Sequence, residues 1–93
     1  SVMKYDVILS DIAQDDLRYF KRNAPNCYKK ALRLLAELLT HPETGTGKPE
    51  RLRYNLAGYW SRRINEEHRM IYRINGEQIE VHVMSMRYHY VKA

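Results

Sequence analysis

The segment Gly47-Lys48-Pro49-Glu50-Arg51-Leu52-Arg53 separates a first half with helical periodicity from a second half with strand-like alternation. Its glycine and proline favour a loop, and the proline restricts the backbone conformation where the loop ends. One carboxylate, that of Glu50, stands among three cationic side chains. Because loops held by rigid elements are where functional side chains concentrate, we expect Glu50 to contribute to a site.

Upstream of this segment, the chain is predicted to begin with a strand and a helix. Residues 4–9 alternate and are rich in strand formers, and Ser10 is suited to cap the helix that follows. A single apolar stripe predicts that helix over residues 12–23. Asp15 and Asp16 are expected to face solvent near its start, where acidic side chains complement the helix dipole.

A second helix is predicted over residues 25–39, because Pro25 disfavours helical geometry in the residue before it and is tolerated in a first turn. Its periodicity is the strongest in the chain. The predicted apolar face consists of Tyr28, Ala31, Leu32, Leu35, Leu38 and Leu39. The first half therefore forms a helical hairpin behind one strand.

Downstream of the segment, short joins connect four stretches that alternate like strands. These stretches are residues 51–54, 59–64, 68–74 and 77–86. Asn75-Gly76 is a strong signal for a two-residue hairpin loop, so the second half is predicted to be an antiparallel meander. The fold class is α+β, in the order β-α-α-β-β-β-β, with both helices packed on one face of a small, mostly antiparallel sheet.

The hairpin at Asn75-Gly76 fixes a register for the two strands that it joins. On the core face, the predicted pairs are Tyr72 with Ile79 and Met70 with Val81. On the opposite face, they are Arg69 with His82 and Arg73 with Gln78. Because two helices cover only one side of so small a sheet, the arginine-bearing side is predicted to stay open as a ligand site.

The length of 93 residues predicts a single domain over the whole chain, 1–93. Ser1 and Val2 precede Met3 and are expected to be residues added ahead of a natural start. Neither a membrane span nor a secretory signal is recognised, so a cytoplasmic location is expected. Cys27 is the only cysteine, which fits a reducing compartment, and it is expected to be a small buried hydrophobic residue.

The net charge of +5 is concentrated in the second half. Residues 1–46 carry 7 lysines and arginines against 6 acids, whereas residues 47–93 carry 9 against 5. Eight tyrosines and one tryptophan accompany these charges in the chain. Such a composition suits a surface that neutralises phosphates and stacks on bases, although an ordinary solvated basic face explains it equally well.

Several familiar kinds of site are not indicated by the residues. The sequence has no Walker loop, and its histidines do not fall at metal-ligand spacings, so no nucleotide cofactor and no metal are expected. A carboxylate, a histidine and arginines suit the cleavage of RNA, whose 2′-hydroxyl is itself the nucleophile. Glu50 is the candidate base, His89 the candidate acid and Arg69 the candidate cation for the transition state.

An alternative interpretation and a geometric requirement both bear on this hypothesis. Glu50, Arg69 and the closing Arg87-Tyr88-His89-Tyr90 also fit a solvated surface, so an undefined nucleic-acid-binding or protein-binding module stays open. Strict alternation also sends His89 to the face opposite Arg69. The last strand must therefore bulge or bend near residues 85–87 for a site to form.

Four motifs carry a resemblance to a known family. They are Gly47-Lys48-Pro49-Glu50-Arg51-Leu52, the run from Asn55 to Ile64 (NLAGYWSRRI), the run from Glu66 to Tyr72 (EEHRMIY) and Arg87-Tyr88-His89-Tyr90. In this order and spacing, the chain resembles the YoeB (Txe) toxins of the RelE superfamily over nearly its whole length. The resemblance implies a RelE-like fold, broadly similar to that of small microbial ribonucleases.

The resemblance also implies an activity and a role for each matching residue. It implies the toxin of a bacterial type II toxin-antitoxin system, a ribosome-dependent endoribonuclease that inhibits translation by cleaving mRNA in the A site without a metal. Glu50 matches the general base, His89 the general acid, Arg69 the phosphate-stabilising arginine and Tyr90 a tyrosine that shapes the site. The supporting RNA-binding residues would be Lys48, Arg53, Arg62, Arg63, Arg87 and Tyr88.

The partners implied by the family are mRNA on the ribosome, a YefM-like antitoxin, a second copy in a homodimer, and operator DNA bound only through the antitoxin complex. Family members commonly end at the tyrosine that matches Tyr90, whereas Val91-Lys92-Ala93 follow here. Two rival hypotheses remain. One is a non-catalytic superfamily toxin that binds gyrase, as the related ParE toxins do, and the other is a general RNA-binding module.

Overall fold

The computed structural model describes residues 4–88. The first half consists of β1 (Asp6–Leu9), α1 (Asp11–Asn23) and α2 (Pro25–Leu38). The second half consists of β2 (Glu50–Arg51), the short 3-10 helix η1 (Tyr54–Leu56), β3 (Trp60–Arg63), β4 (Arg69–Asn75) and β5 (Glu80–Ser85).

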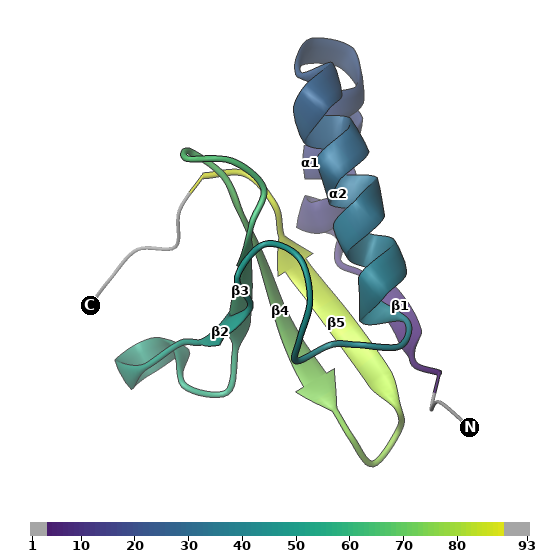
Figure 1. Cartoon of the computed structure of the whole chain (residues 1–93), viewed down its shortest axis with the longest axis vertical. Helices are drawn as coiled ribbons and strands as arrows, with labels where there is room; N and C mark the ends of the chain where they lie inside the picture. Colours follow the sequence, from purple (N-terminus) through teal and green to yellow (C-terminus); the bar gives the residue numbers. More distant parts are fainter. Residues whose placement is uncertain (1–3, 89–93) are drawn as a thin grey trace.

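These strands form one sheet in the order β1-β5-β4-β3-β2, in which β1 is parallel to β5 and the other neighbours are antiparallel. Figure 1 shows the two helices side by side on one side of the sheet, near β1 and β5, while β2 and β3 extend away from them. The predicted α+β fold is confirmed.

Helix α1 begins where the sequence indicates. The hydroxyl of Ser10 accepts a hydrogen bond from the backbone N–H of Ala13 at 3.0 Å, which satisfies one of the unpaired donors of the first turn. The prediction for Asp16 is wrong: its side chain is buried rather than solvent-facing. Asp16 follows Ala13 by three residues and precedes Phe20 by four, so it lies on the buried face between them.

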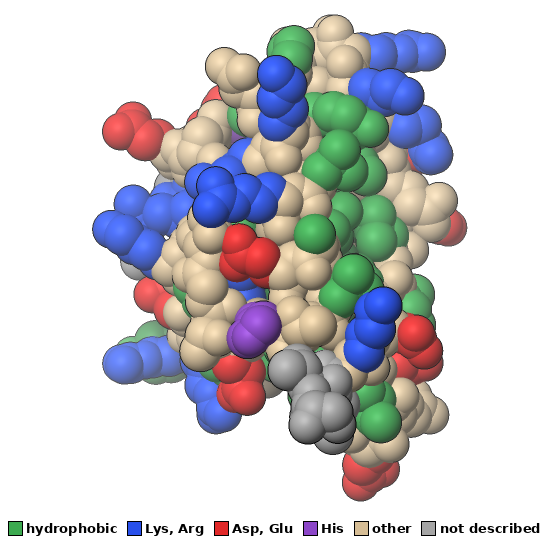
Figure 2. Space-filling model, turned by 45° about the vertical axis from the view of Figure 1, so that its right-hand side comes forward, with side chains coloured by type: hydrophobic (Ala, Val, Ile, Leu, Met, Phe, Trp, Pro, Cys, Tyr) green, Lys and Arg blue, Asp and Glu red, His purple; other side chains and the backbone are tan. Residues whose placement is uncertain are grey.

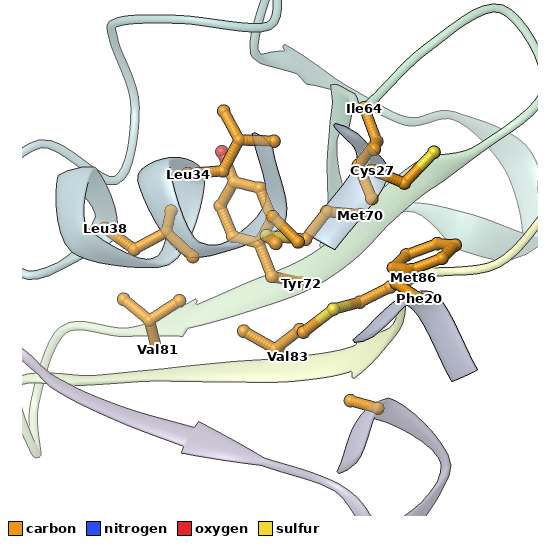
Figure 3. Close-up of a cluster of buried hydrophobic side chains, with 12 residues drawn as sticks. Phe20, Cys27, Leu34, Leu38, Ile64, Met70, Tyr72, Val81, Val83 and Met86 are labelled. Carbon is orange, nitrogen blue, oxygen red and sulfur yellow. The ribbon is translucent and has the colours of Figure 1, made fainter. Parts of the chain in front are cut away.

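Helix α2 supplies the largest part of the helical core, and its buried face overlaps the predicted one: Ala31 and Leu38 are fully buried, and Tyr28 and Leu35 pack against the core. The prediction is wrong for Leu32. Leu32 is 43% exposed, whereas Leu34 is fully buried. The buried face repeats at helical spacing through Cys27, Ala31, Leu34 and Leu38 and confirms the burial of Cys27. In Figure 3, Cys27, Leu34 and Leu38 of α2 lie in one cluster with Met70, Tyr72, Val81 and Val83 of the sheet.

The hairpin between β4 and β5 has a four-residue loop, residues 76–79, so the predicted register is wrong. Arg73 lies opposite His82, and Tyr72 lies opposite Val83. A type I′ loop requires positive φ at both central residues, and neither Asn75 nor Gly76 adopts it. Instead, Asn75 remains in β4, and its side-chain oxygen accepts the N–H of Gln78 at 3.2 Å.

The register error amounts to four residues, an even number, and therefore leaves the predicted faces of the hairpin strands unchanged. Met70, Tyr72 and Val81 are all fully buried, as predicted, whereas Ile79 lies in the loop and is exposed. The other strands are shorter than predicted. Residues 53 and 54 leave the sheet, because Tyr54 adopts a positive φ of 58° at the start of η1.

A bulge in β5 reverses the alternation of that strand near its end. Tyr72 pairs with Val83 and Ile71 pairs with Ser85, so Met84 has no partner across the ladder. Consequently Val83 and Met86, three residues apart, are both fully buried. The structure thus contains the irregularity that the sequence hypothesis requires, one residue before the predicted interval of residues 85–87.

Candidate active site on the open face of the sheet

Glu50 is the first residue of β2 and lies on the sheet face opposite the helices. It pairs with Ser61, which pairs with Ile71, which pairs with Ser85. Side chains of directly paired residues share a face, so this row crosses four strands on one side. Glu50 is exposed, and its carboxylate has no hydrogen bond or ion pair with residues 4–88.

Two arginines lie on the same face as Glu50, two residues along β3 and β4 from the row that contains it. Arg63 of β3 lies directly opposite Arg69 of β4. Neighbouring strands are about 4.8 Å apart, so the backbones of β2 and β4 are roughly 10 Å apart, a span that long arginine side chains can bridge. The strand pairing therefore places Glu50, Arg63 and Arg69 on one face of the sheet.

The side chain of Arg69 is held by the turn that precedes it. Its Nη1 donates to the carbonyl oxygens of Asn65 at 2.6 Å, His68 at 3.0 Å and Glu66 at 3.4 Å. All three bonds use one nitrogen, so Nε and Nη2 are not engaged by residues 4–88. A guanidinium fixed in this way keeps donors for an oxyanion.

Lys48 is exposed and lies two residues before Glu50, in a loop tied to β3. The carbonyl of Gly47 accepts the backbone N–H of Arg63 at 2.7 Å. Gly47 has a φ of +86°, and a Cβ there would lie 2.9 Å from the Arg63 carbonyl oxygen. Only glycine permits this approach without strain, and so the loop brings Lys48 and Glu50 beside Arg63.

Arg62 does not belong to this site, and its predicted role as an RNA-binding cation is corrected. It alternates with Ser61 and Arg63, so its side chain points to the helical side, where it is fully buried. The guanidinium donates to Glu37 Oε1 at 3.0 Å, to the Tyr72 hydroxyl at 3.1 Å, and to the carbonyl oxygens of His41, Thr44 and Thr46. Arg62 is a structural residue that ties the loop after α2 to the sheet.

Burial and charge shift the pKa values of the two side-chain partners of Arg62. Burial raises the pKa of the Tyr72 hydroxyl, and the bond from Arg62 opposes this only in part. Burial also tends to raise the pKa of Glu37. The N–H of Thr46 and the Arg62 guanidinium outweigh that effect and hold the pKa of Glu37 below its ordinary value.

The remaining predicted cations lie outside the row that contains Glu50. Arg53 is exposed and precedes η1. The guanidinium of Arg87 lies 3.6 Å from the ring centroid of Tyr19 in α1 and 5.1 Å from that of Tyr88. Its Nη2 donates to the Tyr88 hydroxyl at 3.2 Å. Arg87 and Tyr88 therefore form an aromatic and cationic cluster with Tyr19 of α1.

Two buried polar residues were missed by the sequence hypothesis, and both bind the backbone that follows β5. Asp16 Oδ2 accepts the N–H groups of Met86 and Arg87, and His68 Nδ1 accepts the N–H of Tyr88. The signals for them were present. Asp16 lies on the apolar stripe of α1, and His68 shares the alternation of Met70 and Tyr72, which face the core.

His89 and Tyr90, the predicted acid and site-shaping tyrosine, lie outside the described residues. Within residues 4–88, no group of three or more His, Cys, Asp or Glu side chains is placed to hold a metal ion. Neither α1 nor α2 is long and apolar enough to cross a membrane.

The helical side carries a different kind of surface. Figure 2 shows a column of hydrophobic side chains there, with lysines and arginines on both sides of it. An open pocket of about 230 Å³ lies between the start of α2, α1 and β1, and is lined by Leu9, Gln14, Leu17, Arg18, Lys21 and Tyr28. This lining contains neither a carboxylate nor a histidine, so it differs in kind from the sheet face that carries Glu50.

Residues 9–90 match the family of YoeB-like toxins of bacterial type II toxin-antitoxin systems. Toxin YoeB of Escherichia coli strain K12 is 38% identical over 84 residues, which cover 90% of this chain and 98% of that protein. A YoeB/ParE toxin from Agrobacterium tumefaciens has a similar structure, with a TM-score of 0.85 and 35% identity over 91% of this chain and 99% of that one. YoeB from Staphylococcus aureus, 38% identical over 94% of this chain and 99% of that one, gives TM-scores of 0.81 as a dimer and 0.79 in complex with YefM.

Proposed function

The chain belongs to the family of YoeB-like toxins of bacterial type II toxin-antitoxin systems, and from this premise we propose that it is an endoribonuclease that cleaves mRNA in the ribosomal A site. The observation that carries the proposal is the placement of an exposed carboxylate, Glu50, on the same open sheet face as Arg63 and Arg69. A base beside two cations is what cleavage of RNA through its own 2′-hydroxyl needs.

In the proposed reaction, the Glu50 carboxylate accepts the proton of the 2′-hydroxyl, whose oxygen attacks the adjacent phosphorus. Arg69 and Arg63 stabilise the negative charge that develops on the five-coordinate phosphorus. His89 donates a proton to the 5′-oxygen as its bond to phosphorus breaks, and Tyr90 shapes the site. The products are a 2′,3′-cyclic phosphate, or the 3′-phosphate formed from it, and a 5′-hydroxyl.

The surroundings of the three described residues support these roles. The bonds from Nη1 to the turn carbonyls orient the guanidinium of Arg69, and its other nitrogens retain donors for a phosphate. Lys48 adds a cation two residues from Glu50, and Arg53, Arg87 and Tyr88 would contact RNA outside the reacting phosphate. Because the nucleophile is the RNA itself, the proposed reaction needs no cofactor.

Substituting Glu50 tests the proposal directly. We expect Glu50→Gln to slow single-turnover mRNA cleavage on programmed ribosomes by about 100- to 10,000-fold, the usual contribution of a positioned base. Glu77→Gln, which changes an exposed carboxylate in the β4–β5 loop, is the matched control and should cleave at the wild-type rate. Undiminished cleavage by Glu50→Gln would rule out Glu50 as the base.

A second assay separates the proposal from a gyrase-binding toxin. The wild-type protein should leave gyrase-catalysed supercoiling unaffected at concentrations that arrest translation. Gyrase inhibition with intact mRNA would favour the non-catalytic alternative.

The role of His89 is tested by substitution. Growth arrest by His89→Gln equal to that by the wild type would remove His89 from the mechanism.

The assembly of the relatives suggests the partners of this chain. The Staphylococcus aureus YoeB has been solved as a dimer and in complex with YefM. We therefore propose that this chain forms a homodimer, is inhibited by a YefM-like antitoxin and contacts operator DNA only through that complex. Co-expression with a YefM-type antitoxin should relieve growth arrest and yield a co-purifying complex, whereas arrest unaffected by such antitoxins would contradict this assignment.

A further inference from the structure

The backbone that follows β5 is held mainly by side chains, together with one backbone hydrogen bond, rather than by a strand ladder. Ladder pairing in β5 ends at Ser85. Beyond it, Asp16 Oδ2 accepts the N–H of Met86 at 2.9 Å and that of Arg87 at 3.1 Å. Asp16 is 9% exposed, so these bonds form where water competes little.

The next residue, Tyr88, is held from the other side by the start of β4. Its N–H donates to His68 Nδ1 at 2.7 Å, and its carbonyl accepts the N–H of Arg69 at 3.0 Å. Tyr88 has a φ of 63°, a conformation that is uncommon for a residue with a side chain and that persists where its surroundings enforce it.

The bond to Tyr88 also defines the state of the His68 ring. A backbone N–H can only donate, so Nδ1 must carry a lone pair, and the ring proton lies on Nε2. Nε2 lies 3.3 Å from Glu67 Oε1, so a carboxylate faces the protonated side of the ring. The ring packs against Phe20 and Tyr88, with centroids 5.1 Å and 5.4 Å away, so its orientation is fixed by packing as well.

We propose that Asp16 and His68 are positioning residues that clamp residues 86–88 and thereby set the place of the catalytic residues that follow directly in the sequence, His89 and Tyr90. The inference rests on the proposed function, because it assigns the clamp a role in that reaction. Asp16 on α1 and His68 before β4 hold one short segment from two elements. The clamp also ties this segment to Arg69, whose N–H binds the same residue, Tyr88.

Paired variants distinguish the clamp from ordinary packing. His68→Phe keeps a ring between Phe20 and Tyr88 but removes the acceptor, whereas His68→Asn places an oxygen near the position of Nδ1. Asp16→Leu removes the second acceptor, and Asp16→Asn retains an amide oxygen. The matched controls are Asp15→Leu, which changes the exposed neighbour of Asp16, and His41→Phe, which changes an exposed histidine.

Two measurements test the proposal on the whole protein. Amide hydrogen exchange should accelerate at least tenfold at residue 88 in His68→Phe and at residues 86 and 87 in Asp16→Leu, with no change in the controls. In mRNA cleavage on programmed ribosomes, both variants should lose at least tenfold in kcat with KM within about twofold, and the asparagine variants should recover part of the loss.

The outcomes are separable. Faster exchange at residues 86–88 with unchanged kcat would overturn the positioning role, and unchanged exchange would overturn the clamp itself. If His68→Phe does not fold, replacing Tyr88 by its α-hydroxy acid removes only the N–H and must reproduce the loss in kcat. A wild-type protein that does not cleave mRNA would overturn the proposed function, and the exchange rates distinguish that failure from failure of the clamp.

Discussion

Arg62 and Arg63 are consecutive residues of β3, yet their side chains lie in opposite environments. Arg62 is fully buried and donates to Glu37, Tyr72 and three backbone carbonyls, whereas Arg63 is exposed beside Arg69. The alternation of a strand produces this division. Buried guanidinium groups require a full set of acceptors, and the loop after α2 supplies them.

Alanine substitutions of these two neighbours should therefore affect different properties of the protein, stability for Arg62 and cleavage rate for Arg63. We expect Arg62→Ala to lower the free energy of unfolding by about 3–5 kcal/mol, because Glu37 and several carbonyls lose their buried partner. Arg63→Ala should change stability by no more than about 0.5 kcal/mol and should instead slow mRNA cleavage. Urea unfolding and single-turnover cleavage measure the two effects, and equal stabilities would contradict the structural role of Arg62.

At the scale of elements, the loop between α2 and β2 determines where Glu50 lies. The Gly47 carbonyl binds the N–H of Arg63, which extends the edge of β3 by one backbone contact. The loop also wraps around the Arg62 guanidinium through the carbonyls of Thr44 and Thr46. The segment that precedes Glu50 is thus a fixed support for the carboxylate rather than a flexible linker.

Substituting glycines tests this support. Gly47→Ala combines a strained φ of +86° with a Cβ 2.9 Å from the Arg63 carbonyl oxygen, so we expect a loss of about 1–3 kcal/mol in stability and a slower cleavage rate. A Cβ at Gly58 would meet no atom within 4 Å, but Gly58 also has a positive φ, +96°. Gly58→Ala therefore measures the effect of backbone strain without a steric clash. Gly76→Ala, with neither feature, should be nearly neutral in both assays. Indistinguishable losses in Gly47→Ala and Gly58→Ala would show that the close approach to β3 is unimportant.

At the scale of the whole molecule, the contact between Glu37 and Arg62 joins the helical half to the sheet. Glu37 lies in α2, Arg62 in β3, and the N–H of Thr46 binds the same carboxylate oxygen at 2.7 Å. These bonds favour the charged carboxylate and hold the pKa of Glu37 below its ordinary value of 4.5, against the opposing effect of burial. Acid therefore weakens the junction between the two halves.

The pH dependence of stability follows from the direction of this shift. Because the pKa of Glu37 is lower in the folded state, its contribution is present above the ordinary value of 4.5 and is lost as the pH falls through the lowered folded value. The difference in unfolding free energy between the wild type and Glu37→Gln should be constant above pH 4.5, and it should shrink as the pH falls from 4.5 to the lowered folded pKa. Urea unfolding at a series of pH values measures this difference, and a difference independent of pH would contradict the assignment.

Local patterns in the sequence were sufficient for much of this fold. The cap at Ser10, the burial of Cys27 and the inward side of Met70 and Tyr72 follow from interactions within a few residues or from strand alternation. The site was predicted only in part. Alternation placed Arg69 on the open side, and the need for a bulge in the last strand was inferred from the same arithmetic.

The sequence by itself therefore determined the α+β fold, the two faces of the central hairpin and the position of Glu50 at the boundary of the two halves, because these depend on short-range periodicity. Only the tertiary structure decided the register of β4 and β5, the burial of Arg62 and the contact of Asp16 with a backbone N–H 70 residues away. Such contacts depend on which faces pack together and on loop geometry, and neither is encoded in the spacing of neighbouring residues.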